Sequence, residues 1–144
     1  GVYASRGLSA LVFRGADSGL DELTTTDANQ VWLVSGGAVV ETVFDARESL
    51  GMASSTIEDL AGGEAAENAE VARDVLSGGG ADAVRDAVAL NVAAGILAWE
   101  GLENPVTRSD FESRMRGAAE RALAALADGS GARLIERWVA ASNV

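Results

Sequence analysis

The hydrophobic pattern of the chain changes once, and this change limits the folds that it can adopt. Apolar runs of strand length occupy residues 8–15, 31–35 and 38–44, and helical periodicity dominates the chain beyond them. Gly36 and Gly37 separate the second and third runs, and glycine accepts the positive φ angles of a two-residue hairpin turn. The pattern therefore predicts an α/β protein with one strand plus a β-hairpin, followed by about four helices.

The helical pattern is carried by four segments: residues 62–80, 82–99, 109–129 and 132–142. The third begins with Ser109 and Glu112 at the spacing of a capping box, in which both side chains accept backbone N–H groups of the first turn. The second loses its polar face after Asp86, which predicts packing on most sides. The last is expected to bury four apolar side chains: Leu134, Ile135, Trp138 and Val139.

The first seven residues have the pattern of the C-terminal end of a helix. Val2 and Tyr3 have few local apolar partners, and Gly7 suits the position just after a helix C-terminus. The strand predicted over residues 8–15 also has no parallel partner elsewhere in the chain. From both observations we expect the chain to be the C-terminal part of a larger α/β domain.

The composition excludes several classes of chemistry. The sequence has no cysteine, histidine or lysine, which removes disulfides, thiolate and imidazole metal ligands, a histidine base and a lysine Schiff base. The net charge of −11 argues against nucleic acid as a partner, because phosphate binding needs a basic face. The longest apolar run, residues 87–99, is shorter than the roughly 20 residues that cross a bilayer. Since no signal peptide is evident, we expect a cytoplasmic protein without a membrane segment.

Two adjacent acids, Asp21 and Glu22, lie in a glycine-punctuated loop after the first strand. Mg²⁺ prefers oxygen ligands, and proteins commonly hold it with one or two carboxylates together with the phosphates of a substrate. The residues alone leave a plain polar turn as the alternative, because a chain with 22 acids places two side by side by chance. Thr24, Thr25 and Thr26 follow, and we interpret them as the β-prone start of the hairpin rather than as hydroxyls near a ligand.

Other polar and aromatic features favour structural interpretations. The glycines of residues 60–69 precede a helix N-terminus that could bind phosphate, but its acidic first turn would repel an anion, so tight glycine packing is favoured. Asn91 and Arg85 lie on the most apolar helix and are expected to form hydrogen bonds in the core. The tryptophans are expected in the core or at an interface: Trp32, Trp99 and Trp138.

Taken in order, the segments "LSALVFRGADSGLDELTTT", "DLAGGEAAENAEVARDVLSG", "AVRDAVALNVAAGILA" and "ADGSGARLIERWV" resemble the C-terminal part of anthranilate phosphoribosyltransferase. The resemblance implies an Mg²⁺-dependent pentosyltransferase of tryptophan biosynthesis, which moves phosphoribosyl from phosphoribosyl pyrophosphate to anthranilate and releases pyrophosphate. The family's Gly-Leu-Asp-Glu motif matches residues 19–22. By resemblance, Asp21 and Glu22 would therefore hold magnesium near the pyrophosphate.

The match to this family has two departures and several missing parts. The family usually has His-Gly where this chain has Arg14 and Gly15, and the turn after Gly15 is one residue longer. The family's glycine-rich phosphoribosyl pyrophosphate loop, its lysine- and histidine-containing segment, its substrate-binding arginine and its N-terminal helical dimerisation domain have no counterpart. The resemblance thus implies that residues 1–144 are a C-terminal fragment of the catalytic domain of a homodimeric enzyme, inactive alone.

Two alternatives to this interpretation stay open from the sequence. One is a related phosphoribosyltransferase or nucleoside phosphorylase that shares the scaffold and uses another acceptor. The other is a non-catalytic acidic module that binds a partner without a metal.

Overall fold

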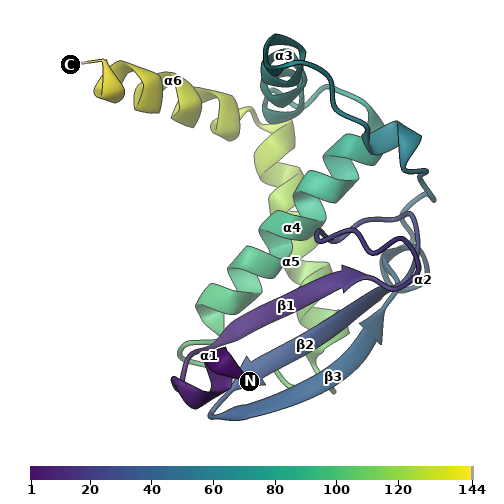
Figure 1. The fold of residues 1–144 in the computed structure, drawn as a ribbon. Coiled ribbons are helices and arrows are strands. Elements are labelled where there is room, and N and C mark those ends of the chain that lie inside the picture. Colours follow the sequence, from purple (N-terminus) through teal and green to yellow (C-terminus); the bar gives the residue numbers. More distant parts are fainter. Residues whose placement is uncertain (144) are drawn as a thin grey trace.

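The computed structural model describes residues 1–143. The elements in chain order are α1 (Val2–Ser5), β1 (Ala10–Gly15), β2 (Asn29–Ser35), β3 (Ala38–Phe44), α2 (Ala46–Leu50), the 3-10 helix η1 (Glu58–Leu60), α3 (Ala65–Leu76), α4 (Asp82–Glu100), α5 (Phe111–Ala127) and α6 (Ser130–Ser142). The three strands form one layer, α4 and α5 form a second, and α6 extends away from both (Figure 1). The α/β prediction, with a strand and a hairpin before the helices, is confirmed.

The sheet is antiparallel throughout, in the order β1-β2-β3. The hairpin is confirmed, since Ser35 pairs with Ala38 across the turn, where Gly36 and Gly37 have φ angles of 56° and 79°. The first strand finds an antiparallel partner in β2, so it does not need the parallel partner that the sequence lacks. It is only half-buried, because it lies at an edge of the sheet and one of its faces is open.

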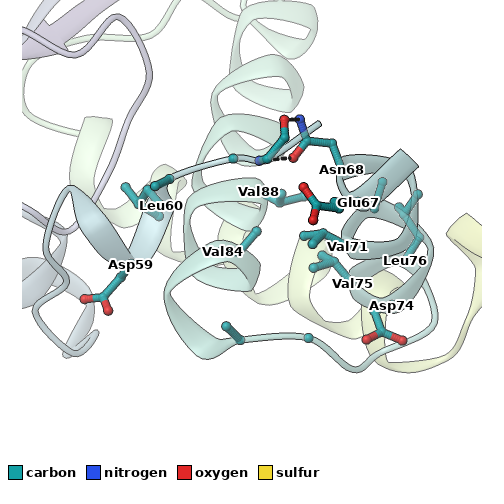
Figure 2. Close-up of a pocket in the computed structure, with 16 residues that line it drawn as sticks. Asp59, Leu60, Glu67, Asn68, Val71, Asp74, Val75, Leu76, Val84 and Val88 are labelled. Carbon is teal, nitrogen blue, oxygen red and sulfur yellow. Dashed lines mark hydrogen bonds between the residues drawn. The ribbon is translucent and has the colours of Figure 1, made fainter. Parts of the chain in front are cut away.

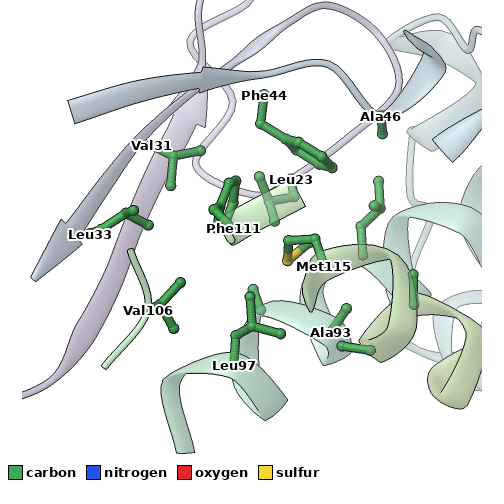
Figure 3. Packing of buried hydrophobic residues seen from close by; sticks show 14 residues of the cluster. Leu23, Val31, Leu33, Phe44, Ala46, Ala93, Leu97, Val106, Phe111 and Met115 are labelled. Atoms are coloured by element: carbon green, nitrogen blue, oxygen red, sulfur yellow. The ribbon is translucent and has the colours of Figure 1, made fainter. Parts of the chain in front are cut away.

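The main core lies between the inner face of the sheet and helices α4 and α5. Figure 3 shows Val31, Leu33 and Phe44 pointing from β2 and β3 toward the helices. The rings of Phe44 and Phe111 meet edge to face, with centroids 5.5 Å apart and an interplanar angle of 77°. Met115 of α5 is fully buried in the same cluster. The first half of the chain thus depends on the second half for its core.

The predicted helix end at Gly7 is confirmed. The N–H of Gly7 donates to Ala4 O at 3.0 Å and the N–H of Leu8 donates to Tyr3 O at 3.1 Å. These two bonds, with Gly7 at a φ of 67°, form a Schellman motif, for which glycine is the preferred residue.

The capping box predicted at Ser109 and Glu112 is wrong in register. Helix α5 begins at Phe111. A reciprocal pair of hydrogen bonds does precede its first turn, but it lies two residues before the predicted pair. The N–H of Thr107 donates to Asp110 Oδ1 at 2.8 Å, and the N–H of Asp110 donates to Thr107 Oγ1 at 3.3 Å. Thr107 and Asp110 have the same spacing as the predicted pair, so pattern alone could not choose between the two.

Burial on the last helix was predicted wrongly. No residue of α6 is buried, and Leu134, Trp138 and Val139 are 55%, 72% and 54% exposed. The helix contacts α3 and α5 near its start, where a Cβ on Gly131 would lie 2.8 Å from Leu76 Cδ2. Ile135 is half-buried, and the other three predicted residues of the apolar stripe are left exposed by the rest of residues 1–143.

Helix α4 is covered on most sides, as predicted, and beyond its first residue only a narrow stripe of Val92, Gly95 and Trp99 is exposed. The residues that it buries follow helical spacing: Ala89, Leu90, Ala93, Ala94 and Leu97. Val92 and Trp99 point away from the core and are 46% and 76% exposed. A core position for Trp99 and Trp138 is therefore wrong, and the interface interpretation of both stays a prediction. Within residues 1–143, no helix is both long enough and apolar enough to cross a membrane.

Candidate metal site

The acid pair lies in the loop of residues 15–29, which joins two neighbouring strands. Gly15 ends β1 and Asn29 begins β2, and these two residues face each other in the sheet. The loop leaves and re-enters the sheet at one point and reaches toward α4 (Figure 1). Both ends of the acid-bearing segment are therefore fixed by the sheet.

The first turn of this loop is held by the carboxylate of Asp27. Its Oδ2 accepts the N–H groups of Asp17 and Ser18 at 2.6 and 2.8 Å, and its Oδ1 accepts the hydroxyl of Ser18 at 3.1 Å. Burial acts to raise the pKa of Asp27, but the hydrogen bonds from Ser18, Asp17 and Thr26 outweigh it and lower the pKa. A Cβ on Gly15 would lie 2.1 Å from Ser18 Oγ, so the turn closes too tightly for a side chain there.

Asp21 and Glu22 follow this turn, and both side chains are exposed. The pKa of Glu22 is raised, chiefly because its acid form can donate a hydrogen bond to the neighbouring Asp21 side chain, and partial burial and the Asp21 charge act in the same direction. The two acids are consecutive residues of one loop, so their negative charges are close together. A divalent cation between them would relieve the repulsion that this closeness creates.

The backbone directly after the pair is held by two asparagines. The N–H of Leu23 donates to Asn91 Oδ1 at 3.1 Å, and Asn91 Nδ2 donates to Leu23 O at 2.9 Å. The N–H of Thr24 donates to Asn29 Oδ1 at 3.3 Å, and Asn29 Nδ2 donates to Thr24 O at 3.0 Å. We call this arrangement, in which one side-chain amide binds both backbone groups of one residue, an amide clamp.

The hydrogen-bonding role predicted for Asn91 is confirmed, but that for Arg85 is not. Arg85 forms an ion pair with the exposed Asp82, with Nη2 and Oδ1 2.8 Å apart. Asn29 and Asp27 were missed at the sequence level. Asp27 carried a usable signal, because Asp often accepts N–H groups in tight turns. Asn29 carried none, since its role depends on the pairing of β2.

The threonines were predicted as the start of the hairpin, and this is wrong. The strand begins at Asn29, and Thr24 and Thr25 are buried in the loop instead. Thr25 Oγ1 donates to Ser55 Oγ at 2.9 Å, which ties the loop to the segment after α2. Thr26 O accepts from Arg47 Nη1 at 3.3 Å. Thr25 and Thr26 thus hold the loop to the residues around it, and burial overrides the β propensity of Thr24 and Thr25.

A hollow of about 640 Å³ opens beside Glu22. It is mostly apolar, and its lining includes Leu20, Ile57, Val88 and Val92. A larger hollow of about 850 Å³ adjoins it between residues 59–63, α3 and α4 (Figure 2). Glu22 therefore borders open space that a ligand can reach.

The helix start at residues 60–69 agrees with the tight-packing prediction. Helix α3 begins at Ala65, and the N–H of Glu64 donates to Glu67 Oε2 at 2.8 Å. A Cβ on Gly63 would lie 2.2 Å from the same oxygen. The carboxylate of Glu67 thus occupies the place at the helix N-terminus where an anion would approach. The low affinity for phosphate stays a prediction.

The donor set at the acid pair suits a weakly held magnesium ion. Among the residues that the structure describes, no three acids, histidines or cysteines group together as a metal cage. Two carboxylates in a loop are what Mg²⁺ needs when waters and substrate phosphates complete its octahedral shell. The two acids therefore fit that ion better than zinc, which favours nitrogen and sulfur ligands that the chain lacks.

Comparison with known proteins shows the family to which the chain belongs. The family model described as "Glycosyl transferase family, a/b domain" matches residues 4–132, and the chain belongs to this family. Its similar relatives include the anthranilate phosphoribosyltransferase of Arthrobacter sp. (strain FB24), 48% identical over 97% of this chain and 38% of that protein. The enzyme of the same name from Nocardia farcinica (strain IFM 10152) is 47% identical over 99% of this chain and 41% of its own length. The chain thus spans about two fifths of these relatives.

Solved structures agree with the family assignment. The anthranilate phosphoribosyltransferase of Thermus thermophilus is 31% identical, with a TM-score of 0.73 over 92% of this chain and 35% of that one. The Saccharomyces cerevisiae enzyme in complex with PRPP and Mg is 20% identical, with a TM-score of 0.57 over 84% of this chain and 35% of that one. The yeast enzyme shows that the fold persists at low sequence identity.

Proposed function

We propose that the chain is a C-terminal part of the catalytic domain of an anthranilate phosphoribosyltransferase and that Asp21 and Glu22 hold its Mg²⁺. The full enzyme would transfer phosphoribosyl from phosphoribosyl pyrophosphate to anthranilate and release pyrophosphate. The observation that carries the proposal is the pair of neighbouring exposed carboxylates on a loop whose two ends are held, in a chain of this family. The names of the relatives, and the yeast enzyme's complex with PRPP and Mg, support the same substrates and ion.

The chemistry follows from the charge that moves. Pyrophosphate gains negative charge as the glycosidic C–O bond breaks, and bound Mg²⁺ would supply the positive charge that stabilises it. Asp21 and Glu22 bind and orient the ion, and neither abstracts a proton. The chain needs no nucleophilic side chain, because the amine of the acceptor attacks directly.

The remaining contacts belong to the part of the enzyme outside these residues. This chain has no lysine or histidine to bind phosphates, and we assign none of its residues to anthranilate. The phosphoribosyl pyrophosphate loop and the N-terminal helical domain would be supplied by the rest of the protein. The inactivity of the fragment, the homodimer and the cytoplasmic location all stay predictions.

The test is a double substitution, Asp21→Asn with Glu22→Gln, in the full-length protein. Turnover should fall on the order of 100-fold, as expected when a charge-stabilising group is lost, and the Mg²⁺ titration should weaken. The control is the other adjacent acid pair, Glu58→Gln with Asp59→Asn, which should leave both unchanged. An unaltered Mg²⁺ titration in the first variant would refute the metal role. Faster turnover of another aromatic amine than of anthranilate would instead favour the related-transferase alternative.

A further inference from the structure

The two amide clamps, formed by Asn91 and Asn29, hold successive residues directly after the acid pair. They come from different parts of the fold, since Asn91 lies in the middle of α4 and Asn29 is the first residue of β2. Asn91 also donates to Ala87 O of its own helix at 2.8 Å, and Asn29 donates to Phe44 O of β3 at 3.3 Å. The backbone after Glu22 is thereby tied to both layers of the domain at once.

The clamps are placed where they control the acid pair most directly. On the N-terminal side, Asp27 holds the turn at Asp17 and Ser18. On the C-terminal side, the clamps hold Leu23 and Thr24, so the segment of residues 19–22 is the short bridge between two fixed points. A bridge of this length has few conformations to lose when a metal binds.

We propose that Asn91 and Asn29 are positioning residues that arrange Asp21 and Glu22 for the metal before it binds. The inference rests on the proposed function, because it assigns the role of the clamps to that metal site. Neither asparagine touches the ion; each acts through the backbone of the residue that it holds. Groups that orient metal ligands in this way typically change metal affinity by about 10- to 100-fold when they are removed.

The chain contains a matched control for this inference. Asn68 of α3 forms a third amide clamp, in which the N–H of Gly63 donates to Asn68 Oδ1 at 2.8 Å and Asn68 Nδ2 donates to Gly63 O at 2.9 Å. Figure 2 shows both bonds beside the larger hollow. The bonding pattern is the same but the loop is a different one, and Asn68 is exposed whereas Asn29 is buried, so Asn68→Leu controls for loss of a clamp and not for loss of a buried amide.

The experiment compares Asn91→Leu, Asn29→Leu and Asn68→Leu in the full-length protein. Hydrogen exchange of residues 19–25 is measured in metal-free protein, and the Mg²⁺ concentration for half-maximal turnover is measured with both substrates saturating. For Asn91→Leu and Asn29→Leu we expect faster exchange and about a tenfold higher Mg²⁺ requirement, with an unchanged KM for the amine. Asn68→Leu should change neither. Asn91→Ala, which leaves room for water at the freed backbone groups, is the substitute if the leucine variant does not fold.

The outcomes separate this inference from the proposed function. If Asn91→Leu and Asn29→Leu lower the melting temperature or speed exchange but leave the Mg²⁺ requirement unchanged, the clamps only stabilise the fold and the inference is overturned. If the Asp21 and Glu22 double variant keeps its Mg²⁺ titration, the metal role itself fails. A raised Mg²⁺ requirement in both clamp variants, together with lost metal dependence in the double variant, supports both.

Discussion

The loop of residues 15–29 and helix α6 differ in a way that reverses the usual expectation. The loop contains no helix or strand between β1 and β2, yet it buries Leu23, Thr24 and Thr25 to between 1% and 3% exposure. Helix α6 is regular from Ser130 to Ser142 and buries none of its residues. The irregular segment is thus held more firmly by the rest of the molecule than the regular one.

The difference shows which forces hold a segment in place. A helix satisfies its own backbone hydrogen bonds, so it can stay regular with few tertiary contacts. A loop must find partners for its backbone elsewhere, and here side chains of Asp27, Asn29 and Asn91 supply them. Among the side-chain N and O atoms of residues 1–143, none that is buried lacks a partner. The contacts that a segment makes with the rest of the fold, and not the regularity of its secondary structure, therefore determine how well it is held in place.

The largest effect is expected for Leu23→Ala. Leu23 is 1% exposed and packs in the main core, so its truncation should cost about 2–5 kcal/mol of unfolding free energy. Urea denaturation measures the loss. Leu102, which is 61% exposed, provides the control, and Leu102→Ala should stay within about 0.5 kcal/mol. Equal losses in the two variants would mean that the loop is no better fixed than an exposed turn.

Thr25→Val should lower the free energy of unfolding by a smaller amount, about 1–2 kcal/mol. The substitution keeps the shape of the side chain but removes the donor to Ser55 Oγ, which is itself buried. Adding Ser55→Ala should recover part of the loss, because the second change removes the unsatisfied group. Denaturation of both single variants and the double variant gives the coupling, and strictly additive losses would show that the bond contributes nothing.

The loop should also respond to acid, through Asp27. The pKa of this carboxyl is lowered from its ordinary value of 3.8, so its stabilisation is complete above that pH and is lost as the pH falls through the lowered value. Asp27→Asn should therefore lower stability at neutral pH and flatten its decline below about pH 4. Thermal melts from pH 7 to pH 2 measure this, and parallel curves for both proteins would contradict it.

The smallest effect is expected on α6. Trp138 is 72% exposed, so Trp138→Ala should change the unfolding free energy of the chain by no more than about 0.5 kcal/mol. The same change measured in a longer protein that contains this chain sharpens the comparison, because a larger loss there would mean that a segment outside residues 1–144 covers the helix. A loss above about 1 kcal/mol in the chain itself would show that α6 is packed after all.

The parts of the fold that could be predicted are those encoded locally. The hairpin followed from Gly36 and Gly37 and the end of α1 from Gly7, whereas the metal role of the acid pair, taken from a four-residue motif, stays a prediction. What could not be predicted depends on distant neighbours. Asn91 acts on Leu23 across 68 positions, and the apolar stripe of α6 carries no sign of whether anything covers it.

The turn at Gly36 and Gly37 also bears on the order in which the molecule folds. Strands β2 and β3 are adjacent in sequence, and such hairpins form within about 1–10 μs. Strand β1 joins them only when the loop of residues 15–29 has closed, and its core side requires α4 and α5 to dock from far along the chain. Contacts between residues far apart in sequence form slowly, because the chain loses conformational entropy before the stabilising contacts are made. We therefore expect the hairpin to assemble first and the acid-bearing loop to acquire its final shape among the last steps of folding.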